Sequence, residues 1–331
     1  MKKIFILLTV VFAMLLTACG GSKDDSKEAA KDNALKVGIV LSTGGLGDKS
    51  FNDSAYRGLE RAKEELGIEF KYVEPASPSE DEQFLREFAE NGYDLVIGVG
   101  FLMKDSVAGV AKEYPDVKFA IIDETIEAPN VTSLVFAEDE GSFLVGALAA
   151  MMTKTDTIGF VGGMEVPLIQ KFQRGYTEGA KYVNPKIKVL TLYTSGPNPF
   201  NDPVRGRESA FAEYNQGADV IFHAAGGTGT GVIDGCKQKG IYAIGVDSDQ
   251  DDVAPGTVLT SMVKHVDNAV FATVKDLQEG KFQAGIHRFG LADDGVGTTD
   301  FKNTKDAIGE EKIKKLEEIK QGIIDGTIKV K

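Results

Sequence analysis

The feature that most constrains the fold is a pattern that occurs twice along the chain. In the first half, the run YDLVIGVG at 93–100 is followed by VKFAIID at 117–123. The second half repeats the pattern with ADVIFHAAG at 218–226 and IYAIGVD at 241–247. In the first half, Asp94 and Asp123 are 29 residues apart. In the second half, the matching Asp219 and Asp247 are 28 residues apart. The matched spacing predicts two similar folding units.

Short β-branched runs alternate with amphipathic segments in both halves. Continuous apolar runs with helical segments between them are typical of parallel strands that are covered on both faces. We therefore predict an α/β fold built from two Rossmann-like lobes. The predicted strands cover residues 37–41, 95–99, 117–122, 158–161, 187–192, 220–222 and 243–246.

Polar motifs follow the predicted strands at the ends where ligands bind in such sheets. GGLGDKSFN at 44–52 follows the first strand, and Asp123 ends the strand at 117–122. GGTG at 226–229 and Asp247 occupy the matching places in the second half. Both glycine runs are also compatible with simple tight turns. The pattern predicts one cleft between the two lobes.

The N-terminal segment is typical of an export signal. Lys2 and Lys3 precede an apolar run at 4–16, which is too short to span a hydrocarbon core of about 30 Å. The sequence LTAC that ends at Cys19 resembles a bacterial lipobox, although an ordinary secretory signal with a chance cysteine is the alternative. We expect residues 1–18 to be a signal peptide, Cys19 to carry a lipid, and 19–34 to be a flexible tether.

Several classes of function lack support in the sequence. With 37 basic and 50 acidic side chains, the net charge of −13 argues against nucleic acid as a partner. The three histidines show no metal-ligand spacing, and there is no G-x-S-x-G elbow or Walker loop. His223 and Cys236 fit a buried core. We therefore expect no catalytic residues, no metal and no cofactor, and a binding protein rather than an enzyme.

The motif DKSFN at 48–52, after a glycine-rich first turn, resembles the opening of the basic membrane protein family. Members of that family are purine nucleoside-binding lipoproteins of ABC importers. The resemblance extends in order over residues 35–290. Further similar segments lie at 97–101, 138–150, 166–181, 200–210, 223–229, 245–250 and 261–270.

The resemblance implies a type I periplasmic-binding-protein fold, in which two lobes with parallel sheets are joined by a multi-strand hinge. The first lobe would take residues 35–153 and about 266–295. The second would take 154–265 and about 296–331. The mature protein would be lipid-anchored on the extracytoplasmic face of the cell membrane.

The family's site residues can be carried onto this chain one at a time. Phe200 matches the position that stacks on the base, where stacking contributes about 1–3 kcal/mol. Phe51 and Phe172 either join it or belong to the core. Asn52 would contact the base edge, and Asp247 would accept from ring N–H and amino groups.

For the ribose, Asp123 matches the family's acceptor for neighbouring hydroxyls. Lys264 and the main chain at Gly227 are the expected helpers. Asp48 either contacts the ligand or orders its loop. The chain has no Trp, the usual platform for a hexose ring, which weakens a hexose-binding interpretation.

These features predict a monomeric receptor that closes over a purine nucleoside (guanosine, inosine or adenosine) and delivers it to an ABC permease. Three alternatives stay open. The first is a receptor of the same fold for a sugar or another small ligand. The second is a secreted nucleoside hydrolase that uses Asp48 and Asp123, and the third is a surface adhesin.

Overall fold

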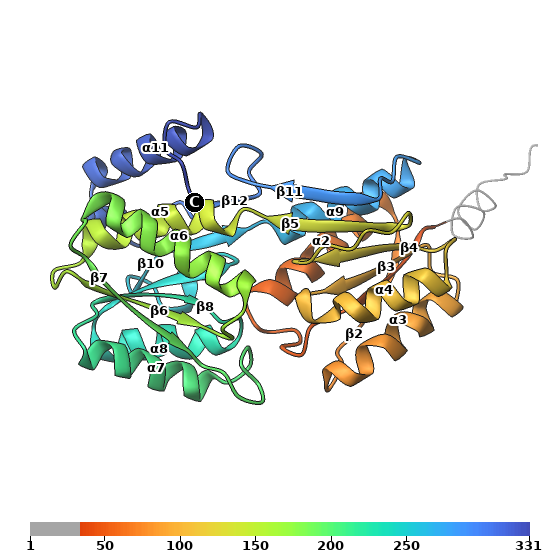
Figure 1. The fold of residues 1–331 in the computed structure, drawn as a ribbon, viewed down its shortest axis with the longest axis horizontal. Coiled ribbons are helices and arrows are strands. Elements are labelled where there is room, and N and C mark those ends of the chain that lie inside the picture. The colour runs from red at the N-terminus through yellow and green to blue at the C-terminus, as the bar shows by residue number, and fades with distance from the viewer. Residues whose placement is uncertain (1–33) are drawn as a thin grey trace, which may run out of the picture. The chain divides into compact units, whose positions relative to one another are not determined.

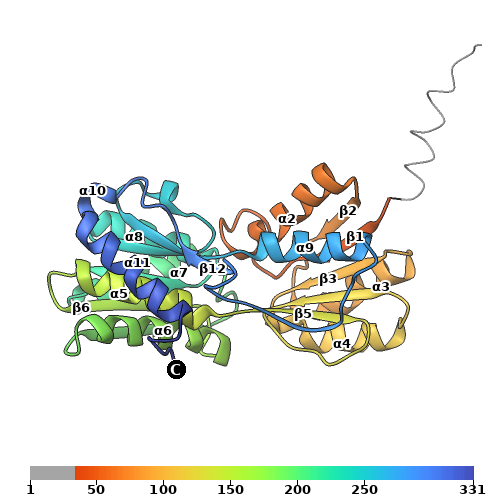
Figure 2. The ribbon, with the colours of Figure 1, turned by 90° about the horizontal axis from the view of Figure 1, so that it is seen from above.

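Two six-stranded sheets organise the part of the chain that the computed structural model describes, residues 34–331. Leu35–Lys331 forms one compact unit, in which each sheet is covered by helices on both faces (Figures 1 and 2). The two predicted Rossmann-like α/β lobes are therefore confirmed. The predicted signal peptide, Cys19 and nearly all of the predicted tether lie outside the described residues.

The first sheet is entirely parallel. Its strands are β1 (Lys36–Val40), β2 (Glu69–Val73), β3 (Leu95–Val99), β4 (Lys118–Ile122), β5 (Val131–Phe136) and β11 (Gly285–Phe289). They lie in the order β11-β5-β4-β3-β1-β2. The central β3 is buried along its whole length, as expected for an apolar strand between two helical layers.

The second sheet repeats this order as β12-β10-β9-β8-β6-β7. Its strands are β6 (Thr157–Gly162), β7 (Lys188–Tyr193), β8 (Val220–Ala224), β9 (Tyr242–Asp247), β10 (Val258–Lys264) and β12 (Val296–Thr298). All pairs are parallel except β10 with β12. The repeat found in the sequence thus corresponds to two sheets of the same strand order, which differ in the direction of one edge strand.

Helices cover both faces of each sheet. In the first lobe they are α2 (Phe51–Leu66), η1 (Pro78–Glu80), α3 (Asp81–Glu90), η2 (Phe101–Met103), α4 (Lys104–Glu113) and α9 (Val266–Gln278). In the second they are α5 (Glu138–Met152), α6 (Pro167–Val183), α7 (Pro203–Asn215), α8 (Thr228–Lys239), η3 (Asp251–Val253), α10 (Lys305–Ile308) and α11 (Glu310–Ile324). Among residues 34–331, no helix is long and apolar enough to cross a membrane.

The chain passes between the lobes three times, after β5, after β10 and between β11 and β12. The helix that follows each of the first two crossings packs on the other lobe. Helix α5 contacts α6, β10 and β12, whereas α9 contacts α2 (Figure 2). These crossings form the predicted multi-strand hinge.

The packing of α5 bears on one predicted boundary. The sequence predicts a first lobe that extends to residue 153, whereas α5 contacts α6, β10 and β12 of the second lobe. We therefore propose a boundary near residue 137. A Cβ at Gly146 would collide with the backbone of Tyr176, and one at Gly179 with that of Phe143. These glycines let α5 and α6 approach closely, which holds α5 on the second lobe.

Candidate functional site

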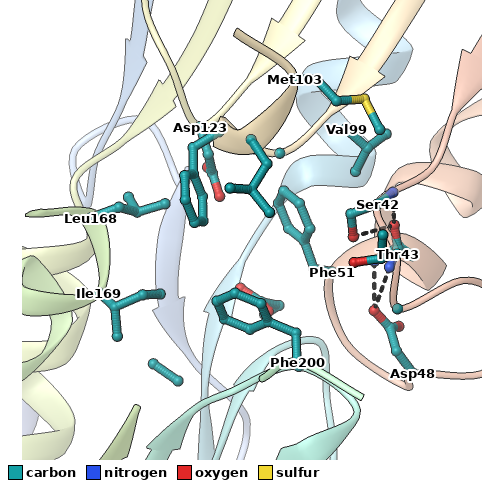
Figure 3. A pocket seen from close by; sticks show the side chains of 18 of the residues that line it. Ser42, Thr43, Asp48, Phe51, Val99, Met103, Asp123, Leu168, Ile169 and Phe200 are labelled. Carbon is teal, nitrogen blue, oxygen red and sulfur yellow. Dashed lines mark hydrogen bonds between the residues drawn. The ribbon is translucent and has the colours of Figure 1, made fainter. Parts of the chain in front are cut away.

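A pocket lies between the lobes, where the carboxyl ends of both sheets face each other (Figure 3). Most of the predicted ligand-binding residues share its lining. They are Asp48, Phe51, Asn52, Asp123, Phe172, Phe200, Asp247 and Lys264. Gly227 does not line the pocket, although its neighbour Gly226 does. The structure therefore brings together residues that are up to 216 positions apart in the sequence.

Lys264 is the centre of a buried charge cluster at the hinge. Its Nζ lies 2.6 Å from Asp123 Oδ2 and 3.8 Å from both Glu138 Oε1 and Asp247 Oδ1. Burial raises the pKa of each of these three carboxyl groups, and Lys264 partly offsets that effect. Burial also opposes the charge of Lys264, but the three carboxylates outweigh it and raise the lysine's pKa. Lys264 is therefore a cation at neutral pH.

Aromatic faces surround the same ammonium group. Lys264 Nζ lies 4.7 Å from the centre of the Phe51 ring and 5.4 Å from the centres of the Phe136 and Phe172 rings. Such contacts favour a cation over the ring faces. Lys264, only 2% exposed, is thus fixed both by charge and by packing.

Asp123 and Asp247 occupy matching positions in the two lobes. Each follows or ends an apolar strand, and each adopts a left-handed backbone, with φ values of 69° and 61°. Aspartate tolerates this region better than most residues, but strained backbone of this kind tends to persist at functional sites. The paired geometry directs two carboxylates into one pocket.

Asp48 orders the loop that precedes α2. Its carboxylate accepts hydrogen bonds from the backbone N–H groups of Ser50 and Asn52, both at 2.9 Å, and of Asp53 at 3.2 Å. Burial nevertheless raises its pKa to about 6. Asp48 was expected either to contact the ligand or to order its loop. These hydrogen bonds are direct evidence for loop ordering.

Asn52 is also held within the first lobe. Its Oδ1 accepts from the backbone N–H of Ser42 at 2.9 Å, and its Nδ2 donates to Asp48 Oδ2 at 3.1 Å. An amide nitrogen carries two hydrogens, so one donor remains for a ligand. The side chain is only 1% exposed and therefore offers that donor in a fixed direction.

Phe200 enters the pocket from a loop of the second lobe. Its ring packs over Gly163, where a Cβ would collide with it, and meets the ring of Phe101 edge-on at 6.3 Å. Thr228 holds the loop, since its N–H donates to the carbonyl of Phe200 at 3.2 Å. The aromatic face is thereby presented opposite Phe51 (Figure 3).

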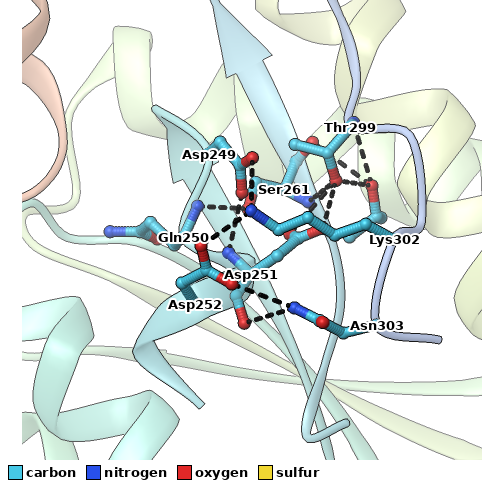
Figure 4. Close-up of polar contacts among 9 residues, drawn as sticks. Asp249, Gln250, Asp251, Asp252, Ser261, Thr299, Lys302 and Asn303 are labelled. Atoms are coloured by element: carbon cyan, nitrogen blue, oxygen red, sulfur yellow. Dashed lines mark hydrogen bonds and ion pairs between the residues drawn. The ribbon is translucent and has the colours of Figure 1, made fainter. Parts of the chain in front are cut away.

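A polar network around Gln250, Asp251 and Ser261 lies next to the end of β9 (Figure 4). Gln250 Oε1 accepts from the backbone N–H of Val246 at 2.9 Å, and its backbone N–H donates to Ser261 Oγ at 2.9 Å. Ser261 and Thr299 both donate to the buried carboxylate of Asp251. The end of β9 is therefore fixed by β10 and by the segment after β12.

Asp247 also connects the two lobes. Its Oδ2 accepts a hydrogen bond from Ser50 Oγ at 2.6 Å, and the neighbouring Ser248 accepts one from Arg57 at 2.9 Å. Gln250 Nε2 reaches the carbonyl of Lys49 at 3.1 Å. The loop that carries the DKSFN motif is thus docked on the second lobe beside the pocket.

Comparison with known proteins decides the family. Residues 35–331 match the Bmp family, described as ABC transporter substrate-binding proteins that are PnrA-like. The chain belongs to this family. Its members are substrate-binding components of ABC transporters, so binding of a small ligand is the activity that the family supports.

Named relatives and a solved structure agree with this assignment. The ABC transporter nucleoside-binding protein BmpA of Lactococcus lactis subsp. cremoris is 34% identical over 359 residues, covering 100% of this chain and 99% of BmpA. An uncharacterized lipoprotein of Pyrococcus horikoshii is 37% identical over 315 residues, covering 90% of this chain and 77% of its own length.

The solved structure is an ABC transporter solute-binding protein of Aeropyrum pernix K1. It superposes with a TM-score of 0.83 at 31% identity, covering 89% of this chain and 92% of that protein. The predicted type I periplasmic-binding-protein fold is therefore confirmed.

Two acidic residues near the pocket were missed by the sequence analysis. Glu138, at the start of α5, forms an ion pair with Lys171 at 2.7 Å and lies beside Lys264. Asp81, at the start of α3, lines the pocket and is only 3% exposed. Both belong to acidic stretches, SEDE at 79–82 and EDE at 138–140, which are typical of solvated helix starts.

The apolar part of the lining was also unpredicted. It comes from the carboxyl end of β3 and the start of α6, and it includes Phe101, Met103, Leu168 and Ile169. Within the described part of the chain, no group of three or more His, Cys, Asp or Glu side chains is arranged to hold a metal ion. What the pocket offers is aromatic faces, carboxylates and one ammonium group.

Proposed function

We propose that this protein captures purine nucleosides in the pocket between its lobes and delivers them to an ABC permease. The observation that carries the proposal is the combination, in one pocket, of aromatic rings and a carboxylate–lysine cluster. A nucleoside has the matching parts, a flat base and a ribose with neighbouring hydroxyls. The nucleoside-binding name of the Lactococcus relative supports the same ligand class.

The ribose is assigned to the end of the pocket at Asp123 and Lys264. Asp123 Oδ2 is bonded to Lys264, while Oδ1 is buried without a hydrogen-bond partner among the described residues. A buried acceptor of this kind gains from a hydroxyl donor, because leaving it unpaired costs about 1–3 kcal/mol. Lys264 can donate to a second sugar oxygen. A free base without ribose is therefore expected to bind weakly.

The base is assigned to the space between Phe51 and Phe200. Stacking accepts any base, whereas Asn52 and Asp247 provide the polar contacts that select the base edge. Lobe closure would bury both faces of the ligand. No step of chemistry is assigned to these residues, and the protein is proposed to act as a receptor and not as an enzyme.

The proposed setting is the outer face of the cell membrane, with the lipid on Cys19 as anchor. That anchor, the monomeric state and the permease partner are proposals. The relative described as a lipoprotein and the substrate-binding family support the first and the last of them.

The ligand class is tested by identifying what the protein retains and what stabilises it. We expect purified residues 20–331 to release a purine nucleoside on denaturation, measured by mass spectrometry. The stripped protein should then gain thermal stability with inosine, guanosine or adenosine. The corresponding monophosphates should fail, because the pocket lining has four aspartates, one lysine and no arginine.

Other outcomes of the same panel distinguish the alternatives. Stabilisation by free ribose or hexoses alone would contradict a nucleoside receptor while leaving the fold intact. Release of free base during incubation would point to a hydrolase. No response from folded, ligand-free protein would favour an adhesin.

Truncating Phe200 is expected to weaken nucleoside binding by about 10- to 100-fold, because one stacking face is worth about 1–3 kcal/mol. Isothermal titration calorimetry of Phe200→Ala measures the loss. Phe211→Ala is the matched control, since Phe211 lies on the same lobe against Lys239 and does not line the pocket. Equal affinities for the two variants would count against stacking on Phe200.

A further inference from the structure

Asp81 is a pocket carboxylate that the contacts described so far do not explain. It is the first residue of α3 and is only 3% exposed. Its Oδ1 is buried and has no hydrogen-bond partner among residues 34–331. Buried polar atoms are almost always paired, and an unpaired one carries a substantial free-energy cost. Because Asp81 also lines the pocket, this oxygen is a candidate acceptor for a bound ligand.

The other pocket aspartates are held by the protein itself. Asp48 accepts from backbone N–H groups, Asp123 is paired with Lys264, and Asp247 accepts from Ser50. Asp81 differs from them, because its Oδ1 receives no hydrogen bond from residues 34–331, although the residue lines the same pocket. A donor for this oxygen must therefore come from outside these residues.

Helix charge alone does not account for Asp81. An acidic side chain near a helix N-terminus is stabilised by the helix dipole. Glu82 in the same turn is exposed and can fill that role in solvent. The Oδ1 of Asp81 accepts no hydrogen bond from the backbone at this N-terminus, and its burial removes hydration that an exposed carboxylate would keep. A buried position is thus unfavourable for a carboxylate whose only role would be to stabilise the helix N-terminus.

Sheet topology places Asp81 away from the Asp123 end of the pocket. Asp123 follows β4, and the strand order from there is β4-β3-β1-β2. Helix α3 begins after β2 and packs over β1 and β3. Since adjacent strands lie about 4.8 Å apart, Asp81 approaches the ligand from one to three strand positions beyond Asp123. That is the side assigned to the base.

We propose that Asp81 is a specificity-determining residue that accepts a hydrogen bond from the exocyclic amino group of a bound purine base. The inference rests on the proposed nucleoside-binding function and names the preferred subclass of ligand. Burial, together with the charge of Glu80, raises the pKa of Asp81 to about 6, so the group is mainly ionised at pH 7.5 and can only accept. The pocket therefore favours aminopurine nucleosides.

The test compares nucleosides that differ only in the amino group. Adenosine is paired with purine riboside, and guanosine with inosine, in calorimetric titrations at pH 7.5. In the wild-type protein, at least one amino-bearing nucleoside should bind about tenfold or more tightly than its partner, as expected for a charge-assisted hydrogen bond. In Asp81→Asn, which keeps the shape and an acceptor oxygen but loses the charge, that ratio should fall severalfold.

Two controls separate this role from a structural one. The amino-free nucleosides should bind Asp81→Asn within about threefold of wild type, and the melting temperature of the ligand-free variant should be unchanged or higher. An unchanged ratio in the variant, or equal weakening of both members of each pair, would overturn the role of Asp81 and leave the nucleoside receptor standing. If purine riboside, inosine and the amino-bearing nucleosides all fail to bind wild type, the proposed function itself is wrong.

Discussion

Replacing Lys264 with methionine is expected to lower the free energy of unfolding by about 3–5 kcal/mol near pH 7.5. Methionine fits the apolar volume of the lysine stem but leaves Asp123, Asp247 and Glu138 without their shared cation. Because the side chain is 2% exposed, water cannot replace the lost charge. Urea denaturation followed by circular dichroism measures the change.

The loss should depend on pH. The lysine's pKa is raised in the folded state, so its charge is fully present at and below neutral pH. The pKa values of the three carboxyl groups are already raised by burial, and removal of the cation raises them further. Acidification therefore protonates them first in the variant, and the deficit relative to wild type should shrink as the pH falls.

Two further variants sharpen this prediction. Adding Asp123→Asn to Lys264→Met should recover part of the lost stability, since it removes one uncompensated carboxylate. Lys302→Met is the surface control, because Lys302 pairs with Asp252 in solvent and its loss should leave the denaturation midpoint nearly unchanged. If Lys264→Met is as stable as the control at pH 7.5, the cluster does not depend on the lysine.

Replacing Glu213 with glutamine is expected to stabilise the protein at alkaline pH. Glu213 lies on α7 with no exposed surface, and neither carboxylate oxygen has a hydrogen-bond partner among the described residues. Burial raises its pKa from 4.5 to about 8. At about 1.4 kcal/mol per pH unit, ionisation opposes folding by up to about 5 kcal/mol above pH 8.

The sign follows from the two protonation states. Below about pH 4.5, the group is protonated in both folded and unfolded chains, and Glu213→Gln should change little. Between pH 4.5 and 8 the unfolded chain ionises first, so wild-type stability falls as pH rises. The variant should therefore melt at a clearly higher temperature than wild type at pH 9 and at a similar one at pH 4.5.

Glu208→Gln on the same helix is the matched control, because Glu208 is exposed. Its effect on the melting temperature should not vary systematically between the two pH values. Parallel pH profiles for wild type and Glu213→Gln would show that Glu213 does not titrate in this range.

Much of the fold was predictable because each lobe repeats the same apolar runs. The strands missed by the sequence analysis have weaker patterns. β2 reads EFKYV and lies at an exposed edge, and β5 carries Thr132 and Ser133 within its apolar run. The sequence also could not predict which lobe α5 packs on. Ten of its residues are buried, and such an apolar helix is expected to be covered, but its sequence does not identify the lobe that covers it.

The site was partly predictable for a similar reason. Asp123 and Asp247 were found because they end apolar runs, and strand ends converge in sheets of this kind. Asp81 and Glu138 could not be found in this way, since their burial depends on tertiary packing. Their functional roles, like those of the other site residues, stay predictions until binding is measured.

Helices α5 and α9, which each pack on the lobe opposite the strand that precedes them, also affect the order in which the protein can fold. Helix α9 and strand β11, which complete the first lobe, lie within the last 66 residues of the chain. A growing chain that has reached residue 265 therefore still lacks one helix and one edge strand of the lobe it began first. Such long-range closure is slow compared with local contacts. The first lobe therefore cannot be completed until α9 and β11 are available, and its closure depends on contacts that are distant in the sequence.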